Sequence, residues 1–97
     1  MSDRPSDEYY ASLERRLRAL LPLVETVVPR DVGHWFNEYL DAGEYGLAVE
    51  TVAEALPDDP SGEAVGALAS RLIAEADVMG LAGPISDRLR RLANKGS

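Results

Sequence analysis

Residues 31–57 read DVGHWFNEYLDAGEYGLAVETVAEALP, and their spacing predicts two helices joined by a tight turn. Apolar side chains recur every three or four residues on both sides of Gly43, and glycine commonly ends a helix in the left-handed backbone region. Asp31 is the expected N-cap of the first helix, the second begins near Glu44, and Pro57 stops it. Because the connection is so short, the two helices should form an antiparallel hairpin.

The first of these helices should lie at the centre of the core. Trp35 and Phe36 are the only tryptophan and the only phenylalanine of the chain, and large aromatic side chains bury the most apolar surface. The expected stripe of this helix comprises Val32, Trp35, Phe36, Tyr39 and Leu40. The expected stripe of the second helix comprises Tyr45, Ala48, Val49, Val52 and Leu56.

Helices are also expected before and after the hairpin. Residues 6–28 predict a helix with Ser6 as its N-cap and a kink or break at Pro22, because proline lacks a backbone donor and crowds the preceding turn. Its apolar stripe comprises Tyr10, Leu13, Leu17, Leu20, Leu21 and Val24. After the hairpin, Asp59 is the expected cap and Pro60 the first residue of a helix that ends at Gly80.

A last helix should open at Pro84, with Leu89 and Leu92 facing the core. Its basic side chains are expected to face solvent; they are Arg88, Arg90, Arg91 and Lys95. No segment shows the alternation typical of a strand. The sequence therefore predicts an all-α fold, with residues 1–97 forming a single small bundle of about five helices and with residues 1–5 and 95–97 frayed.

Size and composition fit one folded domain. The chain has 97 residues, 45% of them hydrophobic and 28% charged, which is too apolar for a disordered protein. It has no cysteine, so disulfides and thiolate metal sites are excluded. The polar start of the chain lacks the apolar run of a signal peptide, and no stretch matches a membrane helix. We therefore expect a cytoplasmic protein without a membrane partner.

The negative charge is concentrated in the middle of the chain. Residues 31–70 contribute −9 to the net charge of −7, and the rest contributes +2. This segment contains no Lys or Arg; its acids are Asp31, Glu38, Asp41, Glu44, Glu50, Glu54, Asp58, Asp59 and Glu63. Such a distribution favours a basic protein partner and argues against direct binding of nucleic acid, which needs a basic surface.

One group of residues is compatible with metal or acid–base chemistry. Asp31, His34, Glu38 and Asp41 share one helical face, expected to lie opposite the Trp35 and Phe36 stripe. An imidazole between carboxylates could bind a divalent metal or act as a base, but the same spacing is typical of a solvated or partner-binding face. His34 is the only histidine, and no nucleophile motif or phosphate loop is present. We therefore expect no enzyme, no metal and no cofactor.

The outward side of the second hairpin helix suggests a binding surface. Glu50 and Glu54 lie four residues apart, where like charges repel by a few tenths of a kcal/mol, roughly. Leu47 should project from the same side, which gives an apolar contact surrounded by charge, as in protein interfaces. The alternative is that the N-terminal helix covers Leu47.

Residues 38–51, EYLDAGEYGLAVET, resemble the central motif of the MafI-family immunity proteins of bacteria. In that motif an aromatic- and acid-containing helix leads into a Gly-Glu-Tyr turn and then a Leu-Ala-containing helix. The family consists of small helical proteins that neutralise a cognate polymorphic toxin, often a ribonuclease domain. Residues 52–60 depart from the family pattern, because they lack its aromatic residue. The resemblance implies a cytoplasmic protein that protects its producer and close kin.

Three hypotheses follow. The leading one is an immunity protein that binds a basic toxin domain, most simply a nuclease, through the acidic helical surface. The second is an adaptor or regulator that binds another basic protein, and the third is a metal-dependent enzyme built on His34 and Glu38. The residues expected to contact the partner are Glu38, Asp41, Glu44, Tyr45, Leu47, Glu50 and Glu54.

Overall fold

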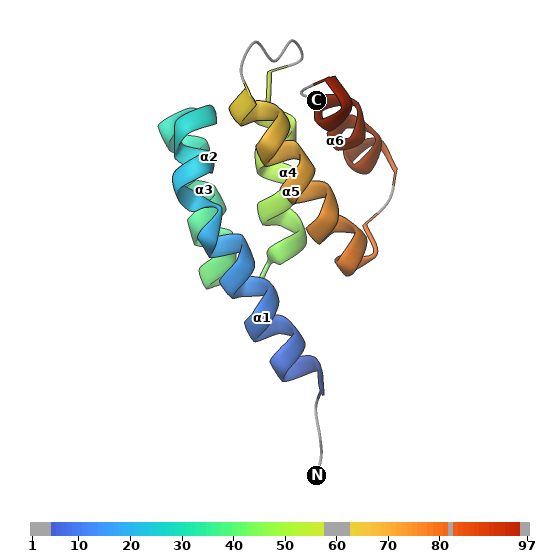
Figure 1. Cartoon of the computed structure of the whole chain (residues 1–97). Helices are drawn as coiled ribbons and strands as arrows, with labels where there is room; N and C mark the ends of the chain where they lie inside the picture. Colours follow the sequence, from blue (N-terminus) through green and yellow to red (C-terminus); the bar gives the residue numbers. More distant parts are fainter. Residues whose placement is uncertain (1–4, 58–62, 82, 96–97) are drawn as a thin grey trace.

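The computed structural model describes residues 5–57, 63–81 and 83–95, and this part of the chain contains six α-helices and no strand (Figure 1). The helices are α1 (Pro5–Ala19), α2 (Leu21–Val27), α3 (Arg30–Asp41), α4 (Tyr45–Ala55), α5 (Glu63–Met79) and α6 (Pro84–Lys95). The all-α prediction is confirmed, with six helices in place of about five. Of the ends expected to fray, only Pro5 and Lys95 are described.

The additional helix arises at Pro22, where the sequence predicted a kink or break. α1 ends at Ala19, Leu20 occupies the N-cap position of α2, and Pro22 lies in the first turn of α2. A proline is tolerated there because the first N–H groups of a helix have no acceptor within the helix. The break still leaves Leu17, Leu20 and Val24 buried.

Two helical hairpins form most of the bundle, and the same motif closes both. Gly43, with a φ of 77°, donates from its backbone N–H to the carbonyl of Leu40, and Glu44 donates to the carbonyl of Tyr39. Gly80, with a φ of 76°, and Leu81 repeat this pattern at the end of α5. These are Schellman motifs, in which a glycine adopts the left-handed conformation at low cost. The predicted helix ends at both glycines are confirmed.

The two hairpins pack around one core. Figure 1 shows α2 and α3 on one side of α4 and α5, with α6 on the other, and α5 contacts α2, α4 and α6. α1 extends past the bundle at the end where both glycine turns lie. The largest fully buried side chains are Phe36, Leu13, Leu17, Leu40, Leu68, Leu72 and Leu89.

Two aromatic residues expected in the core lie at the surface. Phe36 is fully buried, but its neighbour Trp35 is 52% exposed and Tyr10 is 49% exposed. At about 100° per residue, Trp35 and Leu40 lie at opposite edges of the expected stripe, roughly 140° apart. α3 therefore buries Phe36 and Leu40 and leaves Trp35 on its solvent side.

The N-caps predicted at Ser6 and Asp31 are wrong, because both residues lie inside their helices. Ser6 lies inside α1, which begins at Pro5, and Asp31 lies in the first turn of α3 with Pro29 at the N-cap. In the first turn a carboxylate still interacts favourably with the helix dipole. Asp59 and Pro60 lie outside the described residues.

Arg88 was expected to point into solvent, and it binds the end of α4 instead. Its Nε donates to the carbonyl of Ala53 at 2.9 Å, and its Nη2 donates to the carbonyl of Leu56. The last carbonyls of a helix lack N–H donors within the helix and carry partial negative charge, and a guanidinium supplies both hydrogen-bond donors and positive charge. Arg88 thereby ties α6 to α4.

Candidate functional site: a groove between the two hairpin turns

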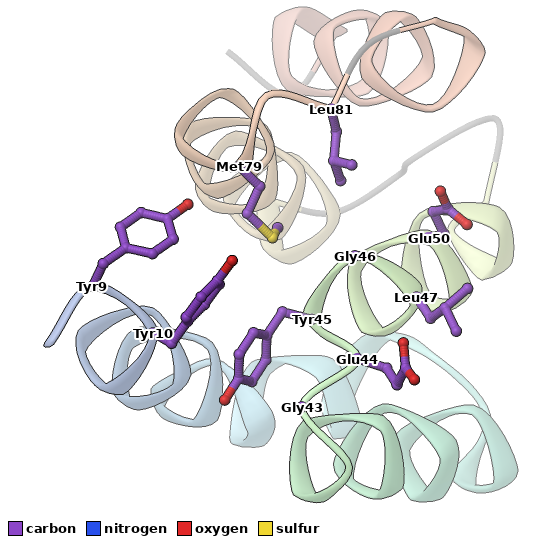
Figure 2. Close-up of a pocket in the computed structure, with 10 residues that line it drawn as sticks. All are labelled: Tyr9, Tyr10, Gly43, Glu44, Tyr45, Gly46, Leu47, Glu50, Met79 and Leu81. Carbon is purple, nitrogen blue, oxygen red and sulfur yellow. The ribbon is translucent and has the colours of Figure 1, made fainter. Parts of the chain in front are cut away.

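The two glycine turns and the start of α1 enclose an open groove of about 420 Å³ (Figure 2). We call it the turn groove. It is lined by Tyr9, Tyr10, Gly43, Glu44, Tyr45, Gly46, Leu47, Glu50, Met79 and Leu81. The lining residues come from three segments that are far apart in sequence, 9–10, 43–50 and 79–81. The packing of α1 against both hairpins brings these segments together.

Tyrosines form one side of the turn groove and fasten α1 to both hairpins. The Tyr9 hydroxyl donates to the carbonyl of Val78 at 3.1 Å, near the end of α5. The ring of Tyr10 stacks on that of Tyr45, with centroids 5.9 Å apart and an interplanar angle of 29°. The Tyr45 hydroxyl donates to Oε1 of Glu14 at 2.9 Å. Three side chains from two helices are thus held in fixed positions.

Carboxylates and one apolar side chain occupy the α4 side of the groove. Glu44 is exposed at the turn, Glu50 is partly buried, and Leu47 is 44% exposed between them (Figure 2). The N-terminal helix therefore does not cover Leu47. Glu54 follows one turn further along α4 and is exposed outside the groove lining. Within the described ranges, none of these three glutamates has an ion-pair partner.

Asp41 and Tyr45 already bind side chains of α1, whereas Glu44, Glu50 and Glu54 bind none within the described ranges. Arg18 binds Asp41 through Nη2, donates to the Asn37 side chain at 3.0 Å, and pairs with Glu14 at 2.8 Å. The Arg18 guanidinium and, to a lesser extent, the Tyr45 hydroxyl hold the pKa of Glu14 below its ordinary value. Partial burial, followed by the hydrogen bond to Glu14, raises the pKa of Tyr45.

The polar face of α3 carries an exposed aromatic group. His34 meets Trp35 edge-on with ring centroids 5.6 Å apart, and Trp35 lies 6.0 Å from the ring of Tyr39. Trp35 therefore accompanies His34 and Glu38 on the solvent side of α3, not the side opposite them. Across the part of the chain that the structure describes, no three His, Asp or Glu side chains are placed to hold a metal ion.

The structure brings some of the predicted contact residues together and separates others. Glu44, Tyr45, Leu47 and Glu50 line one groove, and Glu54 extends it along α4. Glu38 and Asp41 lie on α3 outside the groove lining.

Sequence reasoning missed the contribution of Tyr9, Tyr10, Met79 and Leu81. One available signal was the Tyr9–Tyr10 pair, because adjacent positions on a helix point about 100° apart and two large rings there project in different directions. Met79 and Leu81 gave no such signal; they flank a helix-ending glycine like many apolar residues.

Comparisons with known proteins give no match: no protein-family model matches the chain, and neither the search of curated proteins nor that of solved structures finds a match. Among the described helices, none has both the length and the apolar character needed to cross a membrane.

Proposed function

We propose that this chain is an immunity protein, a stoichiometric inhibitor that binds a basic toxin domain, most simply a nuclease, and protects the cell that makes it. It performs no chemistry of its own. Contact is made through α4 and the turn groove, with the outer face of α3 beside it. The resemblance of residues 38–51 to the immunity-protein motif supports a toxin domain as the partner.

The observation that carries this proposal is the uncompensated charge of α4. Glu44 and Glu50 flank the exposed Leu47, and Glu54 lies one turn beyond Glu50. No cation within the described residues pairs with these three glutamates. Like charges held close together cost stability, while a concentrated negative surface accelerates encounter with a basic protein and orients it. A binding role accounts for keeping this arrangement.

Apolar and aromatic groups beside the charge supply the contact that holds a complex together. Leu47 and Tyr10 are both nearly half exposed at the turn groove, and Trp35 is exposed on α3. Tyrosine and tryptophan are enriched among residues that dominate binding energy. A nuclease binds phosphates with basic side chains, so an acidic surface with these anchors can occupy the place of its substrate.

The experiment is a protection assay with the toxin domain encoded beside the gene of this chain. Changing Glu50→Lys and Glu54→Lys together should abolish protection while the helical circular dichroism is retained. Glu25→Lys is the control, because Glu25 is exposed on α2, which does not line the turn groove. Full protection by the double variant, or a neighbouring gene that encodes no toxin, would contradict the proposal. Capture of a different basic protein would favour the adaptor hypothesis.

A further inference from the structure

We propose that the turn groove receives a single arginine side chain of the partner. The side chain would lie in the groove between the tyrosines on one side and the carboxylates of Glu44 and Glu50 on the other, and its methylene groups would contact the apolar lining. The identity of the partner rests on the proposed function, but recognition of the guanidinium can be tested without any toxin.

Charge complementarity argues for a cation. Glu44 and Glu50 line the groove, and no Lys or Arg lines it. Of the three α1 arginines, Arg16 pairs with Glu75 and Arg18 with Asp41 and Glu14. The third, Arg15, is exposed and does not line the groove. The groove is therefore left with negative charge that the described part of the chain does not neutralise.

The aromatic side of the groove argues for arginine over lysine. The planar guanidinium stacks on aromatic rings, is more weakly hydrated than an ammonium group, and can donate two parallel hydrogen bonds to a carboxylate. Tyr10 offers a half-exposed ring, and Met79 and Leu81 lie across from it (Figure 2). A lysine would use the carboxylates but gain less from the tyrosines.

The groove is also fixed before a partner arrives. Two Schellman turns set the backbone at Gly43 and Gly80, and Tyr9 and Tyr45 fasten α1 to the hairpins by hydrogen bonds. The Leu81 carbonyl accepts from the buried Ser86 hydroxyl at 3.0 Å, which holds the second turn against α6. A preorganised site loses less entropy on binding. Its volume lies in the range of about 300–1,000 Å³ typical of ligand pockets.

The first test uses a blocked Gly-Arg-Gly peptide and backbone amide NMR of the whole chain. Saturable shifts should appear at Gly43, Gly46 and Leu81 at millimolar peptide. The citrulline peptide, which keeps the shape of arginine without its charge, should bind about tenfold more weakly or worse, a loss of about 1.4 kcal/mol. Absence of saturable shifts at these amides, or equal binding of the citrulline peptide, would overturn the inference.

Matched variants locate the effect. Glu44→Gln with Glu50→Gln changes the net charge by as much as Glu25→Lys does. The glutamine pair should weaken the arginine peptide about tenfold, whereas Glu25→Lys should leave it unchanged. Equal weakening by both would show that overall charge, and not the groove, attracts the peptide, and would overturn the inference.

Tyr10→Leu separates this inference from the proposed function. The variant keeps an apolar side chain but removes the ring, so both the arginine peptide and the toxin should bind about tenfold more weakly. If Glu50→Lys with Glu54→Lys abolishes protection while Tyr10→Leu binds peptide and toxin normally, the guanidinium site is wrong and the proposed function stands. If the peptide binds as expected and the toxin does not bind, the site stands and the proposed function fails.

Discussion

Hairpin α3–α4 and hairpin α5–α6 share a turn geometry and differ in how their charges are balanced. Gly43 and Gly80 close them with nearly equal φ angles and the same pair of backbone hydrogen bonds. On α5, Glu75 pairs with Arg16 and Asp77 with Arg90. Across the described ranges, no comparable pair forms with an acid of α4. Packing thus sets the fold of each hairpin and leaves its surface charge open to another use.

α1 accounts for much of the difference. Its Arg16 reaches α5 and its Arg18 reaches Asp41 on α3, but neither pairs with α4. Arg88 of α6 does reach α4, yet it binds the backbone carbonyls of Ala53 and Leu56 at the C-terminus. Within the described residues, the fold therefore neutralises Asp41 on α3 and leaves the acids of α4 without an ion-pair partner.

The largest expected effect compares two neighbours in hairpin α3–α4. Phe36→Ala should reduce the free energy of unfolding by about 3–5 kcal/mol, because the ring is fully buried and its loss leaves a cavity. Trp35→Ala should cost less than about 1 kcal/mol, since half of that side chain is already in water. Denaturant unfolding measures both. Equal losses would mean that the surface position of Trp35 is wrong.

The next largest loss of stability is expected at Arg88, which joins α6 to the end of α4. Arg88→Ala should lower the free energy of unfolding by about 1–3 kcal/mol, because carbonyls at the end of α4 lose a charged donor. Arg91→Ala is the matched control on the exposed side of α6 and should change stability by less than about 0.5 kcal/mol. If the two variants were equally stable, Arg88 would not join α6 to α4.

The two turns themselves should respond alike. Gly43→Ala and Gly80→Ala should each destabilise the protein by about 1 kcal/mol, because alanine is strained at a positive φ. At neither position would the added methyl group meet another atom within 4 Å, so the cost is conformational and not steric. Thermal unfolding of both variants measures it. A large loss at only one glycine would contradict the shared geometry.

The smallest effect is a pH dependence on the compensated side. Since Arg18 and Tyr45 lower the pKa of Glu14 in the folded state, the ionised carboxylate stabilises the fold above its unfolded pKa. That contribution is lost as the pH falls through the lowered folded pKa. The stability of the wild type relative to Glu14→Gln should therefore be highest near neutral pH and disappear in acid. An advantage that grew on acidification would show that the sign of the pKa shift is wrong.

Features of the fold that depend on one residue and its neighbours in sequence were predictable. Gly43, Gly80 and Pro84 bound helices as expected, and Pro22 divides the first segment. Their effects arise from the backbone itself and need no knowledge of packing. The wrong predictions concern features that depend on contacts between distant segments. Whether Trp35 is buried depends on which helices reach its side of α3, and this is settled only by packing.

The candidate site could be predicted only on its α4 side. Glu44, Leu47 and Glu50 lie three residues apart in sequence, so their position on one side of the helix follows from helical spacing. Tyr9 and Met79 join them through contacts between distant segments, which a single sequence does not reveal. The pairing of Asp41 with Arg18 was hidden for the same reason, since 23 residues separate them.

The central claim is that the glutamates of α4 attract a cationic protein, and its most direct measurement is an association rate as a function of salt. The purified chain and the toxin domain encoded beside its gene would be mixed at increasing ionic strength. We predict a rate that falls steeply with salt for the wild type and for Glu25→Lys, and a slower rate with a shallower slope for Glu50→Gln with Glu54→Gln. Identical salt dependence for the glutamine variant and the Glu25→Lys control would contradict the account.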